Sequence, residues 1–309
     1  MDAYWTELTH HGLLAFEGED ARAFLHGQLT CDVAGLPDRR STYGAYCTPK
    51  GRVLGNFLLW VLEGRFVMQL PRTVAAPLQK RLSMYVLRSK VRAADTTQSY
   101  VQYGLAGPGA AAAIATIVGS SPHAPHDMAT GNTGFAIRLP LERYLLVVPA
   151  EQREKAATIL AATAQRPQSW WESLDIAAGI ATVLPQTQEQ FVPQMLNLDA
   201  IGGVSFTKGC YPGQEIVARM HYLGRLKERL FRARVAAADA PQPGDKVYGV
   251  DLGNQACGMI VNGASAGNAT HELLAVMRLG SVAAGPVRLG ATDGPVLEIE
   301  DLPYALPER

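Results

Sequence analysis

The sequence predicts an α+β fold in which two related strand-and-helix modules are followed by a small β-barrel. A strand that ends in proline and leads into a charged helix occurs twice in the first part of the chain. After about Lys227 the pattern changes to short alternating strands separated by turns, which is typical of a small barrel. Domains commonly take about 100–200 residues. The 309-residue chain is therefore divided into residues 1–227, the α+β region, and residues 228–309, the barrel.

The first elements are predicted from apolar spacing and turn residues. A helix opens at Gly18-Glu19-Asp20, because the apolar residues after it recur at helical spacing. Pro49-Lys50-Gly51 separates two extended segments and predicts a hairpin, since proline and glycine each fix one of the turn's backbone angles. The predicted elements are a strand over 13–16, a helix over about 21–29, strands over 43–48, 52–62 and 65–70, and a helix over about 73–87.

The repeated passage runs from Arg65 to Pro71 and again from Arg143 to Pro149, and an amphipathic helix follows each copy. Two such modules would bury their apolar faces against a shared surface, and the crevice between them is a natural ligand site. The alternative is a chance likeness, because any strand, proline and helix in succession resembles this pattern.

Later elements follow the same reasoning. Trp170, Trp171 and Leu174 lie on a predicted helix over 169–180, and an irregular stretch rich in proline, glutamine and asparagine comes after it. The barrel strands are predicted over 230–235, 246–250, 258–261, 273–279 and 296–299.

Composition limits the possible functions. The chain is 48% hydrophobic and 18% charged, so it can bury a core, and its formal net charge is zero. A neutral chain lacks the broad attraction that non-specific nucleic-acid or membrane binding requires. Its longest apolar run, 53–62, is too short for a membrane span, and the N-terminus lacks a secretory signal pattern. We therefore expect a cytoplasmic protein that binds neither membranes nor nucleic acid directly.

The cysteines give the sharpest chemical signal. The chain has four, with no C-x-x-C pair and no metal-ligand cluster, so reduced thiols and no metal site are expected. Cys210 follows Gly209, and Pro212 suits the first turn of a helix through Ile216 and Val217. A thiol immediately before a helix N-terminus is favoured as thiolate, and Lys208 adds a positive charge. The alternative is a buried apolar filler, which is the stronger interpretation for Cys31, Cys47 and Cys257.

Other candidates have equally plain structural interpretations. The Trp170–Trp171 pair either fills a core or stacks on a flat heteroaromatic ring. His10-His11 lacks an acidic partner nearby in sequence. Gln214 and Glu215 either orient a ligand or serve the helix start.

The segment Lys208–Glu215, with Phe191–Gln194 and Asn197–Asp199 before it, resembles the signature of the YgfZ-type folate-binding proteins. Upstream segments agree with this resemblance, which covers essentially the whole chain. They are Phe24–Asp32, Pro49–Arg52 and Leu87–Val91.

The resemblance implies a relationship to the glycine-cleavage aminomethyltransferase, the T-protein. It implies a split ferredoxin-like α+β body with a C-terminal β-barrel, and tetrahydrofolate or a derivative as the bound cofactor. It further implies support of iron–sulfur enzymes, including those that modify tRNA, with these enzymes or their assembly proteins as partners. Cys210 matches the family's key cysteine, with Lys208 beside it. The expected folate contacts are Trp171, Tyr211, Gln214, Glu215 and His11.

The chain departs from the transferase at two acidic positions. Gly55-Asn56 stands where the transferase has its acidic pair, and Ala177 stands where it has a glutamate that contacts folate. Asn56 cannot supply the negative charge that would hold a protonated aminomethyl group. Ordinary aminomethyl transfer is therefore not expected. Two alternatives stay open: a folate-dependent one-carbon transferase whose acid or base is Asp32 or Asp199, and a non-catalytic interaction module on the same fold.

Overall fold

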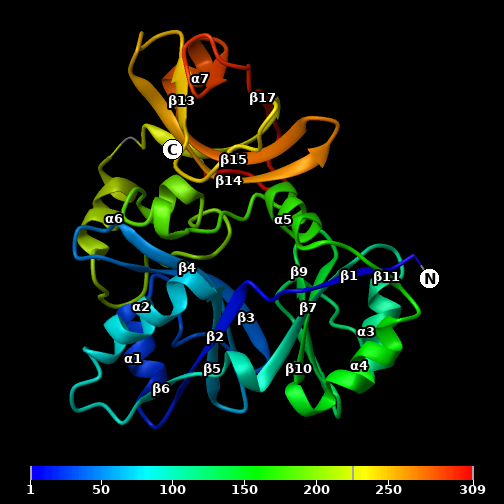
Figure 1. Cartoon of the computed structure of the whole chain (residues 1–309). Helices are drawn as coiled ribbons and strands as arrows, with labels where there is room; N and C mark the ends of the chain where they lie inside the picture. The colour runs from blue at the N-terminus through cyan, green and yellow to red at the C-terminus, as the bar shows by residue number, and fades with distance from the viewer. Residues whose placement is uncertain (1, 225, 308–309) are drawn as a thin grey trace. The chain divides into compact units, whose positions relative to one another are not determined.

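The computed structural model describes residues 2–224 and 226–307, and Figure 1 labels most of its helices and strands. The chain divides into two compact units, each assembled from separate stretches of the sequence. The first unit takes Met1–His26, Asp32–Tyr43 and Phe57–Trp171, and the second unit takes Gly27–Cys31, Gly44–Asn56 and Glu172–Arg309. The predicted division between residues 227 and 228 remains a prediction.

The first module is built on a five-stranded sheet with the strand order β3-β4-β5-β2-β6. β4 and β5 are joined by Glu63 and Gly64, whose φ angles are 53° and 75°. Two central residues with positive φ form a type I′ turn, and the twist of this turn matches that of the paired strands. The elements are β2 (His11–Glu17), α1 (Ala21–Gln28), β3 (Arg40–Cys47), β4 (Val53–Leu62), β5 (Arg65–Pro71), α2 (Arg72–Ser83) and β6 (Arg92–Asp95).

The second module is built on a six-stranded sheet with the order β11-β1-β7-β10-β9-β8. Val101, Tyr103 and Leu105 of β7 pack into the core that α3 and α4 cover. Since side chains alternate along a strand, Gln102 and Gly104 lie on the opposite face, called the inner face below. The elements are β1 (Tyr4–Glu7), η1 (Thr97–Ser99), β7 (Tyr100–Ala106), α3 (Ala110–Val118), β8 (Met128–Gly131), β9 (Gly134–Leu139), β10 (Arg143–Pro149), η2 (Ala150–Gln152), α4 (Arg153–Leu160) and β11 (Ala164–Gln165).

The repeated passage has the same local structure in both copies. β5 ends at Pro71 and leads directly into α2, and β10 ends at Pro149 and leads through η2 into α4. The two prolines have nearly the same backbone angles, φ −57° and ψ 135° at Pro71 and φ −52° and ψ 142° at Pro149. β6 pairs antiparallel with β2, and β1 pairs antiparallel with β7 in the corresponding place. An N-terminal strand therefore completes the second module.

Two helix ends differ from the prediction. α2 was expected to reach Leu87 but ends at Ser83, and Leu87 itself has a positive φ of 44°, which a helix does not tolerate. The helix predicted to end at Ile180 ends at Ala177. The reason is Gly179, whose φ of 66° is a left-handed conformation that ends helices.

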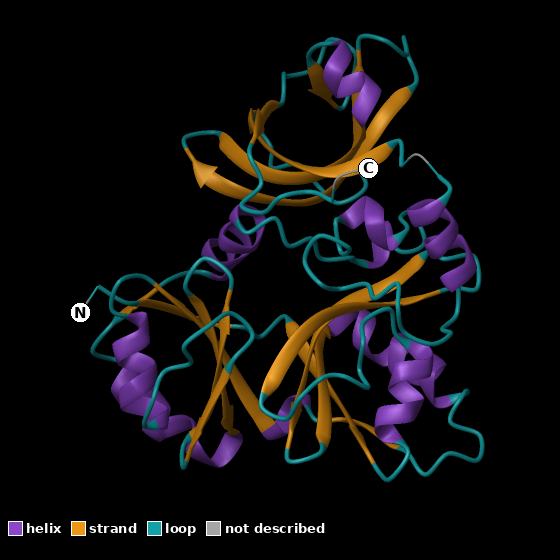
Figure 2. Ribbon diagram, turned by 180° about the vertical axis from the view of Figure 1, so that it is seen from behind, coloured by secondary structure: helices purple, strands orange, loops and turns teal. Residues whose placement is uncertain are grey.

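The last part of the second unit is an antiparallel sheet with the order β16-β13-β14-β15-β12-β17, and Figure 2 shows that it curls into a half-barrel. Its core contains Val247, Ile260 and Leu273. β16 and α7 were not predicted, because both are short. From α5 onward the elements are α5 (Gln168–Ala177), η3 (Pro185–Thr187), η4 (Pro193–Leu196), α6 (Gln214–Tyr222), β12 (Glu228–Ala236), β13 (Lys246–Gly249), β14 (Ala256–Gly267), β15 (Thr270–Arg278), α7 (Leu279–Ala284), β16 (Val287–Leu289) and β17 (Glu298–Glu300).

Among the described residues, no helix combines the length and apolar character that a membrane crossing requires.

Candidate functional site

The loop before α6 presents Cys210 at the surface of the second unit. Cys210 is exposed, whereas Cys31, Cys47 and Cys257 are buried. Burial raises the pKa of the Cys47 thiol far above its ordinary value. Cys210 is therefore the thiol that a reagent or a partner can reach.

Two glycines lock this loop against the turn between β3 and β4. Gly213 has a φ of 83°, and a Cβ there would lie 2.5 Å from the carbonyl oxygen of Thr48 and 2.6 Å from the Cα of Gly51. Gly51 has a φ of 71°, and a Cβ there would lie 3.1 Å from the Cβ of Ile216. Backbone meets backbone at this point. Only glycine satisfies both the angle and the space at Gly213.

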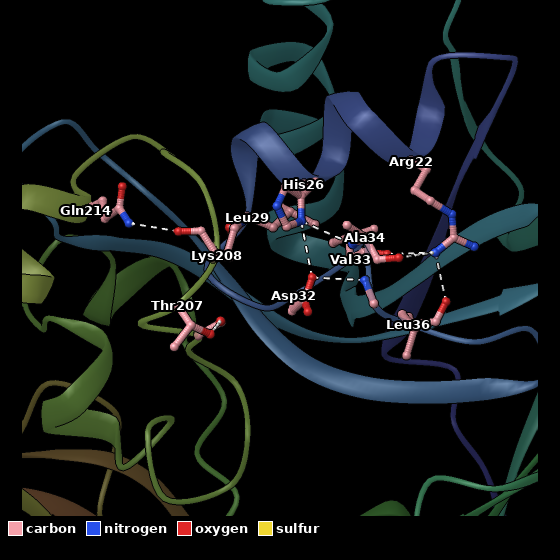
Figure 3. Close-up of polar contacts among 12 residues, drawn as sticks. Arg22, His26, Leu29, Asp32, Val33, Ala34, Leu36, Thr207, Lys208 and Gln214 are labelled. Atoms are coloured by element: carbon pink, nitrogen blue, oxygen red, sulfur yellow. Dashed lines mark hydrogen bonds and ion pairs between the residues drawn. The ribbon is translucent and has the colours of Figure 1, made fainter.

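Lys208, Tyr211 and Gln214 belong to the segment that carries Cys210, and Figure 3 shows the contact between Gln214 and Lys208. The Lys208 ammonium donates a hydrogen bond to the Leu29 carbonyl oxygen and lies 4.9 Å from the centre of the Tyr211 ring. The Gln214 side-chain amide lies 3.5 Å from the Lys208 carbonyl oxygen. These contacts hold a positive charge in the segment that carries Cys210.

Tyr211 forms the buried floor of this segment, with 6% of its surface exposed. Burial raises the pKa of its phenol, and the Cys47 and Cys31 thiols raise it further. The phenol therefore stays neutral, and the buried ring acts as a packing group. Glu215 is exposed in the first turn of α6.

The predicted position of Cys210 immediately before a helix N-terminus is wrong. α6 begins at Gln214 with Gly213 as its N-cap, so Pro212 lies outside the helix. The reason is a turn in which the Gln214 N–H donates to the Tyr211 carbonyl oxygen at 3.1 Å. The helix dipole acts mainly within one turn of the helix end. Cys210 therefore lies outside the end of the helix.

Trp171 lies in the first unit, on the inner face of the second module. The ring lies against the backbone of Gly104, because a Cβ there would come within 2.4 Å of it. The Arg143 guanidinium carbon is 5.2 Å from the ring centre, which is cation–π distance. Trp171 and Arg143 are 2% and 1% exposed. The indole is thus packed on all sides, and its contact with folate stays a prediction.

His11 begins β2 in the same unit. The Gln102 side-chain amide donates to the His11 carbonyl oxygen at 3.1 Å, and the Gln69 amide donates to Gln102 Oε1 at 2.7 Å. Burial and the neighbouring His10 ring lower the pKa of His11 well below its ordinary value. Its ring nitrogen Nδ1 is buried and finds no hydrogen-bond partner among the described residues. Buried polar atoms are normally hydrogen-bonded, so a bound ligand could supply the hydrogen-bond partner of His11 Nδ1.

The sequence pattern missed the Gln69–Gln102 pair and Arg143. Their signal was present, since each is a polar residue at an inward position of an otherwise apolar strand. The five residues of the Cys210 segment and the two of the first unit thus form separate groups, each within its own unit.

Known proteins are similar to this chain over almost its whole length. Residues 2–133 match the family model described as the GCVT N-terminal domain. The tRNA-modifying protein YgfZ of Yersinia enterocolitica is 33% identical over 301 residues, covering 96% of this chain and 91% of the relative. The protein of the same name from Serratia proteamaculans is 32% identical over 302 residues, with the same coverage. The chain belongs to the YgfZ family.

The fold of this YgfZ-family chain is that of the aminomethyltransferases, as predicted. The glycine cleavage system aminomethyltransferase T from Bartonella henselae superposes with a TM-score of 0.76 at 16% identity, covering 98% of this chain and 86% of that one. At this identity the likeness concerns the fold alone.

Asn56, expected from the resemblance to stand at an acidic position of the transferase, makes structural hydrogen bonds with both ends of its side-chain amide. Its Nδ2 donates to the Ala181 carbonyl oxygen at 2.6 Å, and its Oδ1 accepts from the Val183 N–H at 2.8 Å. An aspartate could accept the second bond but could not donate the first. Asparagine at this position therefore fixes the 181–183 segment.

The two carboxylates considered as an alternative acid or base differ sharply. Both oxygens of Asp199 accept from the Arg229 guanidinium, at 2.7 and 2.9 Å, and the side chains are 4% and 6% exposed. Asp32 is 51% exposed, lies 3.4 Å from His26 Nδ1 and accepts from the Gly35 N–H (Figure 3). Asp199 is occupied by its partner, so Asp32 is the freer of the two.

Residues 2–224 and 226–307 contain no group of three or more histidine, cysteine, aspartate or glutamate side chains that could hold a metal ion.

Proposed function

We propose that this chain binds a reduced folate and uses the Cys210 thiol to support iron–sulfur enzymes that act in tRNA modification. The observation that carries the proposal is the Cys210 loop, in which an exposed thiol lies in a segment fixed by two interlocked glycines. Curated relatives are named tRNA-modifying proteins. The fold is one that the glycine-cleavage enzyme also uses.

Within this function Cys210 is the reacting or partner-binding group. Lys208 supplies a positive charge in the same segment, held by the Leu29 carbonyl oxygen and the Tyr211 ring. Tyr211, Gln214 and Gly213 position the loop through packing and hydrogen bonds. The role of Glu215 is proposed as an exposed acceptor at the edge of the segment.

The first unit offers a partial fit to folate. His11 presents a buried ring nitrogen that lacks a partner among the described residues, as a ligand-contacting group would. Trp171 offers no free face for stacking, so we assign it a supporting role beneath the ligand contacts. Bound folate would supply a one-carbon carrier, and this chain's residues would bind and orient it.

Ordinary aminomethyl transfer is disfavoured for two reasons. Both the Nδ2 and the Oδ1 of Asn56 are hydrogen-bonded to the backbone, and the Ala177 side chain has no hydrogen-bond acceptor for a folate. A one-carbon transferase that uses Asp32 is the second candidate, favoured only by the exposure of that carboxylate. A pure interaction module is the third, and absence of folate binding would favour it.

The cysteine role is tested by complementation of a strain that lacks this gene. Cys210→Ala and Cys210→Ser are both expected to fail to restore iron–sulfur enzyme activity, because neither carries a thiol. Thr207→Ala changes an exposed neighbour in the same loop and should restore activity fully. Full restoration by Cys210→Ala would overturn the role of the thiol.

Folate binding is tested by calorimetric titration with tetrahydrofolate and with 5-formyltetrahydrofolate. Saturable binding is expected, and it should weaken by about 2- to 10-fold in Trp171→Ala, because the ligand contacts lose the indole that supports them; this range corresponds to the energy of one aromatic packing contact. Trp170→Ala removes the neighbouring indole, which packs on Tyr4, and should leave the affinity unchanged. No binding of either folate would reject the folate part of the proposal while leaving the cysteine experiment valid.

A further inference from the structure

A pocket of about 450 Å³ lies between the two sheets of the first unit. The first module contributes Leu13, Trp60 and Val67 to its lining, and the second contributes Phe135 and Val147. All five are buried, with at most 7% of their surface exposed. A volume of this size and an apolar floor are typical of sites for small organic molecules, which span roughly 300–1,000 Å³.

The pocket is separate from the predicted folate contacts. Along the inner face of β7, Tyr100 lines the pocket, Gln102 bonds to Gln69, and Gly104 supports Trp171. Strand residues are spaced by about 3.3 Å, so Tyr100 and Gly104 are about 13 Å apart. The buried amide pair therefore lies between the pocket and the indole.

The mouth of the pocket carries charged groups. Glu17, Glu63 and Arg65 line it, which gives a net charge of one negative unit. Arg65 is already engaged, since its Nε lies 2.6 Å from Glu17 Oε1 and its Nη1 donates to the Tyr100 hydroxyl at 3.1 Å. Glu63 is exposed on the turn and has no ion pair among the described residues. The Glu63 carboxylate is therefore the charged group at the mouth that can interact with a ligand, and its negative charge favours a cation.

We propose that this pocket is a second ligand site, which takes a small molecule with a flat apolar body and a protonated amine at its head. The body would pack against the apolar surface that Trp60 and Phe135 form together, since their rings touch edge to face with centres 5.8 Å apart and planes inclined by 61°. The amine would meet the Glu63 carboxylate at the mouth. A folate, which carries carboxylates on its tail, has the wrong charge for this mouth.

The test uses para-fluorophenethylamine as the probe, followed by ¹⁹F NMR titration of the full chain, with para-fluorophenylacetate as the anion of similar shape. The amine is expected to bind saturably with a dissociation constant below about 1 mM, and the acid at least several-fold more weakly. Glu63→Gln should weaken amine binding by about 5-fold, the scale of one exposed charge pair. Val67→Phe fills the pocket and should abolish binding.

The matched control is Glu142→Gln, because Glu142 is an exposed glutamate at positive φ in the corresponding hairpin between β9 and β10, outside the pocket lining. It should bind the amine as the unaltered chain does. Equal binding of amine and acid, binding that survives Val67→Phe in a folded variant, or no binding of either probe would each overturn the proposal. Competition by tetrahydrofolate would also overturn it, since the pocket would then be the folate site.

Discussion

The substitution Asp199→Asn tests whether the Asp199 carboxylate has a structural or a catalytic role. Arg229 donates to both Asp199 oxygens, and it also donates to the Gln194 carbonyl oxygen at 3.1 Å. Asparagine keeps the shape and one acceptor but removes the charge. The Arg229 guanidinium, with a side chain only 6% exposed, would then be a buried cation without its counter-ion.

The size of the effect follows from this burial. Breaking a buried pair by removing one partner costs about 3–5 kcal/mol, and we expect the lower end, about 3 kcal/mol, because the amide retains one acceptor. Domains are commonly stable by only about 5–15 kcal/mol. For a domain of roughly 150–250 residues, 1 kcal/mol shifts Tm by about 2–4 °C. Asp199→Asn should therefore lower Tm by about 6–12 °C.

The assay is urea and thermal unfolding followed by far-ultraviolet circular dichroism, alongside a one-carbon transfer assay with tetrahydrofolate. Replacing both partners, in Asp199→Leu with Arg229→Met, should recover most of the lost stability, because it removes the stranded charge. Asp32→Asn is the control at an exposed carboxylate and should change stability by less than about 0.5 kcal/mol.

A loss below about 1 kcal/mol in Asp199→Asn would refute the structural interpretation. So would a variant that keeps its stability but loses a transfer activity that the unaltered chain possesses. Either result would return Asp199 to the set of candidate bases.

Three further changes probe other contacts. Asn56→Asp removes the donor to a backbone carbonyl and should cost about 1–3 kcal/mol in urea unfolding without creating aminomethyl transfer; the appearance of that activity would contradict our interpretation. Gly213→Ala should cost clearly more than Gly202→Ala, because only the first lacks space for a Cβ although both have positive φ, 83° and 77°; equal losses would show that the loop is not locked there. Burial and the nearby Arg40 lower the pKa of His126 to about 4 in the folded chain. Between about pH 6.5 and 4 the unfolded chain therefore binds a proton on His126 that the folded chain does not. The free energy of unfolding should fall over this range as the pH drops, by up to roughly 3 kcal/mol. His126→Gln should remove that part of the pH dependence, and an unchanged profile would count against it.

Local pattern sufficed for most elements and for the family. Apolar spacing and turn residues predicted the strands of the first hairpin, the repeated passage that ends in Pro71 and Pro149, and the half-barrel strands other than β16. The Cys210 motif could be recognised from the sequence for the same reason, because its glycines, proline and cysteine lie within a few residues of one another. Such features depend on neighbours within a few residues, which a single sequence displays directly.

Tertiary packing decided the contacts between distant segments. Nothing near Gly51 or Gly213 in the sequence shows that their backbones touch, and nothing near Trp171 shows that Gly104 and Arg143 enclose it. α6 begins at Gln214 and not at Pro212, because a turn closed by the Gln214 N–H and the Tyr211 carbonyl oxygen precedes it, with Gly213 in a left-handed conformation. The sequence by itself indicated many of the helices and strands and singled out Cys210 among the four thiols, whereas β7, α3, β9 and β16 were among the elements it did not predict. Only the tertiary structure decided which side chains are exposed, which carboxylates are paired with arginine, and where the pocket lined by Trp60 and Phe135 lies. These features depend on packing between residues that are far apart along the chain.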